Sequence, residues 1–151
     1  MKTTILRVLF LVLVLPFPLP ASLGGDVRSV QQDQDKMKGT LQTTSGNSYT
    51  LHEIQTPTGL SVKEYVSPSG EVFAVTWKGP FPPDLRQILG TYFDQYSQAA
   101  QTQLAQQRGH GPLFIQQLGL VVQVTGHMKS FSGKAYVPQM LPAGVRAEDL
   151  Q

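Results

Sequence analysis

The clearest pattern of hydrophobic and polar positions lies in residues 84–107. Apolar or aromatic side chains recur there every three or four residues, at Leu85, Ile88, Leu89, Tyr92, Phe93, Tyr96, Ala99, Ala100 and Leu104. This period places them on one side of an α-helix. Asp84 can cap the first turn, with Gln87 three residues later as in a capping box, and Gly109 follows where a helix stops. The pattern predicts one long amphipathic helix whose opposite side is rich in glutamine.

A second pattern, typical of β-strands, covers residues 49–77. The same turn signal occurs in it twice, eleven residues apart, as Pro57-Thr58-Gly59 and Pro68-Ser69-Gly70. Proline presets φ and glycine accepts a positive φ, as short hairpin loops require. We therefore predict a three-stranded antiparallel meander with strands at Tyr49–Thr56, Leu60–Ser67 and Glu71–Trp77.

The register of this meander follows if each loop has three residues, so that Thr56 faces Leu60 and Ser67 faces Glu71. One face then carries Tyr49, Leu51, Tyr65, Phe73, Val75 and Trp77. The other face carries Thr50, His52, Ile54, Val62, Glu64, Val66, Val72, Ala74 and Thr76. We expect the aromatic face to meet the long helix, because aromatic side chains bury the most surface. On the other face we expect a charge-assisted pair between His52 and Glu64.

The remaining elements complete an α+β fold. Residues 26–38 form a short helix with Asp26 as its cap, and its apolar stripe is so narrow that we expect a peripheral element or a docking arm. Further strands are predicted at Leu113–Gln117, Leu120–Thr125 and Phe131–Val137. The expected architecture is a twisted antiparallel β-meander packed against one long amphipathic helix, with a short peripheral N-terminal helix.

Residues 1–23 are typical of a secretory signal peptide. Lys2 and Arg7 supply the positive start, and residues 8–15 form an apolar run. An uncleaved membrane anchor is the alternative, but this run has about half of the roughly 20 residues that a span needs. We expect cleavage after Ala21 or Gly24.

Export then defines the domain organisation and the location. We expect residues 24–151 to form a single domain in the periplasm or outside the cell, with the helical arm at 26–38 and no membrane span after cleavage. The chain has 12 basic and 10 acidic residues, and loss of Lys2 and Arg7 leaves ten of each. Because nucleic-acid binding needs a basic surface, we exclude that role. The absence of cysteine excludes disulfides and thiol nucleophiles.

Histidines provide the main candidate chemistry. His52, His110 and His127 are separated by more than a helical turn, and no H-E-x-x-H spacing occurs. The favoured interpretation is a structural pair at His52 and two solvated loop residues. The alternative is a metal- or small-molecule-binding protein that uses His52, Glu64 and His127, with the adjacent Met128 suited to copper.

Enzymatic interpretations have less support. A hydrolase would need His52, Glu64 and a serine to meet in one pocket. A glycosidase would pair Glu64 with Glu53 or Glu71, and the predicted register argues against this because it puts Glu53 and Glu64 on opposite faces. We assign no catalytic residue and no cofactor.

The uncharged glutamine side of the long helix is either a solvated surface or a protein interface, since interfaces lack charge at their centres. Two aromatic residues at the corner before the helix extend the candidate surface, which comprises Trp77, Phe81, Gln95, Gln98 and Gln103. The leading hypothesis is a non-enzymatic binding or assembly module whose partner is another envelope or secreted protein.

Short motifs spread over the chain resemble a family of exported bacterial proteins known as domain of unknown function 2844. They are Leu23-Gly24-Gly25-Asp26-Val27, His52-Glu53, Glu64-Tyr65-Val66-Ser67-Pro68 with Gly70, Val72-Phe73-Ala74-Val75, Trp77 with Gly79-Pro80, Pro83-Asp84-Leu85-Arg86-Gln87, Gly126-His127-Met128 and Pro142-Ala143-Gly144-Val145. The resemblance implies export and a single domain, and it supplies no catalytic residue.

Overall fold

The computed structural model describes residues 23–106 and 111–151. Seven strands in this part of the chain form one antiparallel sheet in the order β1-β2-β3-β4-β7-β6-β5. They are β1 (Thr40–Ser45), β2 (Thr50–Gln55), β3 (Ser61–Val66), β4 (Val72–Gly79), β5 (Leu113–Gln117), β6 (Leu120–His127) and β7 (Ser130–Tyr136). The helices are α1 (Val27–Met37), α2 (Leu85–Leu89) and α3 (Phe93–Gln106), with 3-10 turns at Gly90–Tyr92, Pro138–Met140 and Ala147–Asp149. The α+β fold predicted from the sequence is confirmed.

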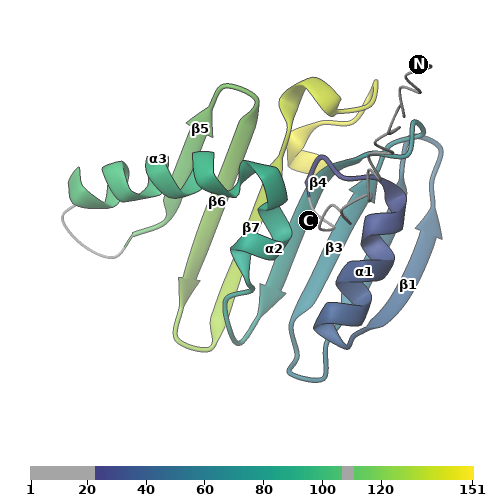
Figure 1. Ribbon diagram of the computed structural model, residues 1–151, viewed down its shortest axis with the longest axis horizontal. Helices are drawn as coiled ribbons and strands as arrows, with labels where there is room; N and C mark the ends of the chain where they lie inside the picture. Colours follow the sequence, from purple (N-terminus) through teal and green to yellow (C-terminus); the bar gives the residue numbers. More distant parts are fainter. Residues whose placement is uncertain (1–22, 107–110) are drawn as a thin grey trace, which may run out of the picture.

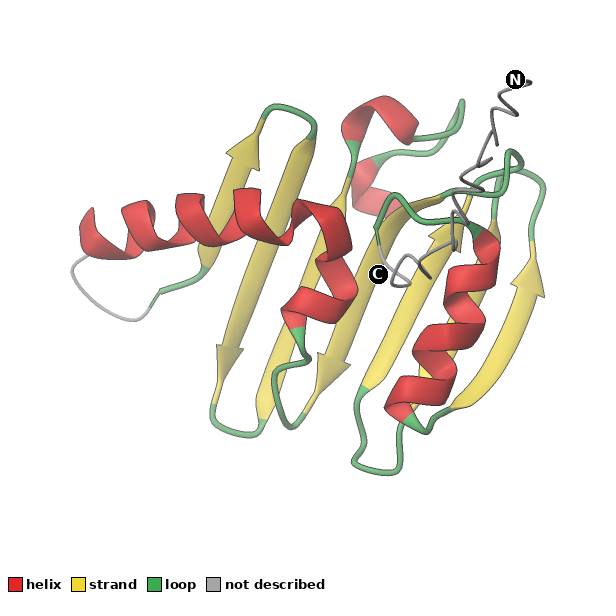
Figure 2. Ribbon diagram, viewed as in Figure 1, coloured by secondary structure: helices red, strands yellow, loops and turns green. Residues whose placement is uncertain are grey.

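All three helices lie on one face of the sheet, which we call the helix face (Figure 2). The opposite side is called the open face. The predicted N-terminal helix is present, with Asp26 accepting a hydrogen bond from the Arg28 amide as its cap. It packs on the sheet instead of extending as an arm, because Val30 and Asp33 are fully buried. The edge strand β1 was not predicted, since Leu41 is its only hydrophobic residue.

The first hairpin has the predicted register, with Glu53 opposite Lys63 and His52 opposite Glu64. The second departs from it, because a β-bulge follows the turn: Tyr65 lies opposite Ala74, and Val66 opposite Val72. Phe73 is the extra residue of the bulge, so from Ala74 onward each residue of β4 lies on the face opposite to the predicted one.

The bulge and the helix packing correct our assignment of the faces. Tyr49, Leu51, Tyr65 and Phe73 lie on the open face, where the chain after β7 covers them. The helices pack instead on the face that carries Val62, Val66 and Val72. Val75 and Trp77, expected with the aromatic group, belong to this helix-face core because the bulge turns them over.

The long helix predicted over residues 84–107 is broken at Gly90. Asp84 caps α2 as expected, but the next turn is 3-10 and α3 continues in a different direction (Figure 1). Gly90 has φ 51° and ψ −120°, a backbone conformation that residues other than glycine rarely adopt. Gln87 does not complete a capping box; its side chain reaches Asp33 on α1.

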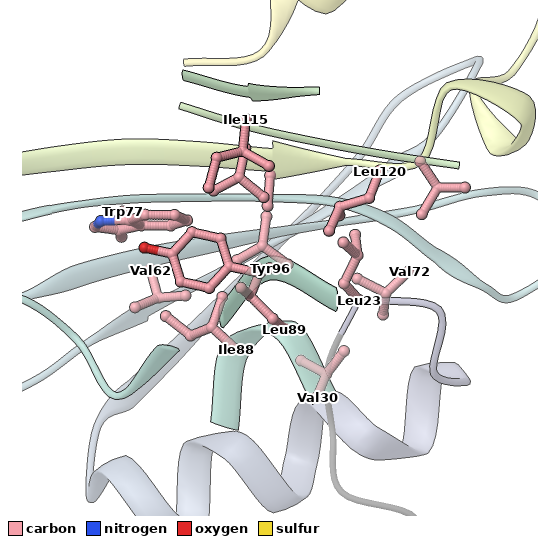
Figure 3. Packing of buried hydrophobic residues seen from close by; sticks show 14 of the residues in the cluster. Leu23, Val30, Val62, Val72, Trp77, Ile88, Leu89, Tyr96, Ile115 and Leu120 are labelled. Carbon is pink, nitrogen blue, oxygen red and sulfur yellow. The ribbon is translucent and has the colours of Figure 1, made fainter. Parts of the chain in front are cut away.

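The main core lies between the helices and the sheet. Leu89 and Ile88 from α2 and Tyr96 from α3 pack with Trp77 and Ile115, among other residues (Figure 3). Gly133 on β7 makes room for the indole ring, since a Cβ there would lie 2.3 Å from Trp77 Cζ2. This core therefore joins the sheet from β3 to β5.

Candidate functional site

The structure separates the residues of the predicted partner surface. Trp77 is only 3% exposed and belongs to the core, so its assignment to a surface was wrong. Phe81 is exposed in the connection between β4 and α2. Gln95, Gln98 and Gln103 lie together on α3, beside the edge strand β5.

These three glutamines line a groove of about 640 Å³ between α3 and β5. Its other lining residues are Ala99, Thr102, Gln106, Phe114, Ile115, Gln116 and Gln117. None of them is charged at any pH. Gln95 also fixes the adjoining β5–β6 turn, because its Nε2 donates a hydrogen bond of 3.0 Å to the Leu118 carbonyl.

The helix α3 crosses β6 and β5 and then continues beyond the edge of the sheet (Figure 1). Its inward side runs through Tyr96, Ala100 and Leu104 at intervals of four residues. Ala100 is 7% exposed, whereas Leu104 is 55% exposed although it continues the same stripe. The helix therefore carries its apolar side past the last strand.

The strand β5 is one of the two edges of the sheet, so no strand of residues 23–106 or 111–151 pairs with one side of its backbone. Its sequence, Leu-Phe-Ile-Gln-Gln, has no charge or proline to discourage a further strand. Phe114 on this strand and Leu118 in the following turn are both exposed. We call β5 and the last turns of α3 the α3–β5 edge.

At the other end of the sheet, α1 covers a buried polar cluster. Asp33 and Glu64 are 0% and 1% exposed, and their carboxyl groups interact with each other. Gln87 Nε2 donates a 2.6 Å hydrogen bond to Asp33 Oδ1. Burial raises the pKa of Asp33 to about 6, although the hydrogen bond from Gln87 acts to lower it. Burial also raises the pKa of Glu64 well above its usual value. A proton retained by the pair lets one carboxyl group donate to the other.

The predicted ion pair between His52 and Glu64 does not form, although the two residues are opposite each other. His52 Nδ1 is instead 3.0 Å from Thr43 Oγ1 on the unpredicted strand β1. His52 Nε2 and Glu64 Oε2 are buried without a hydrogen-bond partner among the described residues. Burial lowers the pKa of His52, which favours a neutral ring. This arrangement lacks the relay from carboxylate to imidazole to hydroxyl that a hydrolase needs.

The three residues of the metal alternative are not brought together. His52 and Glu64 are buried beneath α1, whereas His127 ends β6 and is exposed. Within residues 23–106 and 111–151, no three His, Cys, Asp or Glu side chains are placed to hold a metal ion. His110 lies outside the described residues.

Asp33 was not predicted as a site residue from the sequence. The available signal was its spacing, because Val30, Asp33 and Met37 share one side of α1 and the other two are apolar. A carboxylate at a position of that stripe indicates a buried polar group. Its partner Glu64 was noticed, but β1 and its Thr43 were not, so the histidine was assigned to the wrong neighbour.

Residues 20–150 match the family described as "Protein of unknown function (DUF2844)". The chain belongs to this family. Comparison with curated proteins and with solved structures found no match. Among the helices of the described residues, none combines the length and the apolar character needed to span a membrane.

Proposed function

We propose that this DUF2844 protein is an exported, non-enzymatic binding module that takes up an extended segment of another envelope or secreted protein at the α3–β5 edge. The observation that carries the proposal is Leu104. It continues the inward apolar stripe of α3, yet it is exposed because the sheet ends at β5.

Because α3 extends past β5, we expect one more strand to lie beside β5 and to contact Leu104. Neighbouring strands lie about 4.8 Å apart, so an added strand would lie beside β5 and under the projecting end of α3. Its backbone would pair with the unpaired side of β5, and alternate side chains would cover Leu104. Most of the affinity would come from backbone hydrogen bonds and apolar burial.

The lining of the groove defines the kind of segment that fits. The glutamines offer donors and acceptors, but no residue of the groove carries a charge to pair with a charged ligand. A charged side chain would lose hydration here without gaining an ionic partner. The expected ligand is therefore an uncharged, extended segment that is rich in β-branched or apolar residues.

Site-specific photo-crosslinking in cells that produce the protein tests this proposal. The crosslinking residue is placed at position 104, at position 116 on β5 and, as a control, at position 128. Met128 is also strongly exposed, at 89%, but it lies in the β6–β7 turn. We expect adducts from positions 104 and 116 that join an extended, uncharged segment of a second protein, and none from position 128.

The opposite pattern would contradict the proposal. Adducts from position 128 alone, or adducts from position 104 that are unaffected by Gln116→Lys, would show that β5 does not accept a strand. Adducts with a second copy of this chain, accompanied by a dimer in sedimentation, would replace the proposed partner by self-association.

Export is supported by the signal-like pattern of residues 1–23, and Leu23 sharpens the expected cleavage. Leu23 is buried in the core, and its amide donates a 3.0 Å hydrogen bond to the Ile88 carbonyl. Cleavage after Gly24 would remove this residue, so we expect cleavage after Ala21. The intact mass of the protein recovered from the periplasm or the medium distinguishes the two cuts, and an uncleaved cytoplasmic chain would contradict export.

A further inference from the structure

The part of the open face near the β2–β3 turn is lined by polar side chains. Two rows of side chains cross the strands there, one formed by Glu53, Lys63, Thr76, Lys134 and Gln123, the other by Gln55, Ser61, Lys78, Ser132 and Thr125. All ten are polar. They line a hollow of about 730 Å³, a size typical of small-molecule sites.

Positive charge is concentrated in this hollow. Three lysines and a single acidic side chain line it, although the chain without residues 1–23 has equal numbers of basic and acidic residues. The two ion pairs found among the described residues, Arg28–Asp26 and Arg146–Asp149, involve none of these lysines. The excess charge of the hollow is therefore not neutralised by a salt bridge within the described chain.

The one acidic side chain that lines the hollow, Glu53, is hydrogen-bonded to other partners. Glu53 Oε1 accepts hydrogen bonds from Gln55 Nε2 at 3.0 Å and from Ser61 Oγ at 2.9 Å. These bonds lower the pKa of Glu53, with a further contribution from the charge of Lys63. Lys63 remains more than 4 Å from that carboxylate, since no ion pair forms between them. Its ammonium group is thus available to a ligand.

The three lysines lie close enough together in the sheet to contact one compact ligand. Lys63 and Lys134 are two strands apart in the same row, which separates their Cα atoms by about 10 Å. Lys78 is two residues along β4 from Thr76, in the neighbouring row. Thr76 lies between Lys63 and Lys134 in the same row, and the Ser132 hydroxyl, 2.9 Å from Thr125 Oγ1, is next to Lys78. Lysine binds phosphate as a flexible point charge, and no arginine lines the hollow to form the bidentate pair typical of carboxylates.

We propose that this hollow binds a compact ligand with two or more phosphoryl groups, through Lys63, Lys78 and Lys134. This site is on the opposite side of the sheet from the α1 cluster and does not depend on the α3–β5 edge. The segment after β7 forms one wall, because Lys134 Nζ donates a 2.8 Å hydrogen bond to the Ala147 carbonyl and Leu150 and Gln151 line the hollow.

Titration calorimetry with inorganic tripolyphosphate, on the protein without residues 1–21, tests this proposal. We expect binding at low salt that weakens as salt is added, since the attraction is between charges. Lys63→Gln and Lys78→Gln should each weaken it roughly tenfold, as expected for a charge-assisted contact. Orthophosphate, with a single phosphoryl group, should bind more weakly than tripolyphosphate by at least the same factor.

Arg28→Gln is the matched control, because it removes one positive charge from the helix face and should leave binding unchanged. Thermal unfolding shows whether the lysine variants keep the fold; Lys134→Gln is avoided because Lys134 also holds Ala147. Absence of binding at millimolar tripolyphosphate, or equal weakening by Arg28→Gln, would overturn the site. Binding to vesicles of anionic phospholipid without binding to tripolyphosphate would also overturn it, in favour of a membrane surface.

Discussion

The two ends of the sheet deviate from ordinary packing in opposite ways. Beneath α1, the protein buries two carboxyl groups and an imidazole. At the α3–β5 edge, it leaves Leu104, Phe114 and Leu118 exposed. The first end is closed and polar inside, and the second is open and apolar outside.

This difference indicates what each end contributes. A buried carboxyl pair costs desolvation energy and gains little unless its hydrogen bonds are complete, so the α1 end makes stability depend on pH. An exposed apolar stripe beside an unpaired strand leaves hydrophobic and hydrogen-bonding free energy to be gained from a partner. The closed end therefore affects folding, and the open end affects binding.

The largest effect is expected at Leu89, which packs in the core between the two ends. Leu89→Ala should lower the free energy of unfolding by roughly 2–5 kcal/mol, because it leaves a cavity around a fully buried side chain. Leu118→Ala, at a site that is 93% exposed, should change it by less than about 0.5 kcal/mol. Denaturant unfolding measures both. Equal effects would show that the core is not where we place it.

A smaller effect, dependent on pH, is expected at the closed end. The pKa of Asp33 is raised from 3.8 to about 6 in the folded protein, and the pKa of Glu64 is also raised. Their contribution to stability is therefore greatest in acid and is lost as pH rises through these folded pKa values. Glu64→Gln should stabilise the protein at pH 8 relative to the wild type, by on the order of 1–3 kcal/mol, with little difference at pH 5.

The ionisation of His52 changes stability with pH in the opposite direction, so its effect must be distinguished from that of the carboxyl pair. Its pKa lies below the usual 6.5, so its contribution is lost as pH falls below about that value. The charge of Lys36 favours ionised Asp33. Because His52 and Lys36 are unchanged in Glu64→Gln, the difference between variant and wild type isolates the pair. Equal destabilisation at pH 5 and pH 8 would contradict a shared proton.

The hydrogen bond between α2 and α1 should contribute less. Gln87→Ala removes the donor to Asp33 Oδ1 and should cost about 1–3 kcal/mol, since it leaves a buried acceptor unpaired. It should also raise the pKa of Asp33 further, because Gln87 stabilises the charged form. Side-chain carboxyl NMR shifts follow this titration, and Gln98→Ala on the exposed side of α3 is the control. An unchanged Asp33 titration would exclude the contact.

The smallest effect on stability is expected at the open end. Leu104→Gln should change the free energy of unfolding by no more than about 0.5 kcal/mol, because the residue is exposed. It should nevertheless abolish the adduct formed from position 116. A clear loss of stability in Leu104→Gln would mean that this residue is already covered in the isolated protein.

The sequence predicted the elements better than their packing. Repeated Pro-x-Gly turns and the three- and four-residue spacing are local signals, so the hairpins and both helical regions were found. The bulge at Phe73 and the break at Gly90 depend on tertiary packing, and they reversed the faces and divided the helix. Glutamines of the candidate surface were identified from their lack of charge. The projection of Leu104 beyond β5 could not be predicted, because that needs knowledge of the order of the strands in the sheet.

Amide hydrogen exchange of residues 113–117 tests the central claim that the α3–β5 edge is open and takes a strand. In the isolated protein, we predict fast exchange for the β5 amides that point away from β6 and slow exchange for those paired with it. In the complex obtained by crosslinking at position 104, the outward amides should become slow as well. Slow exchange of all five amides in the isolated monomer, or no change on complex formation, would contradict the account.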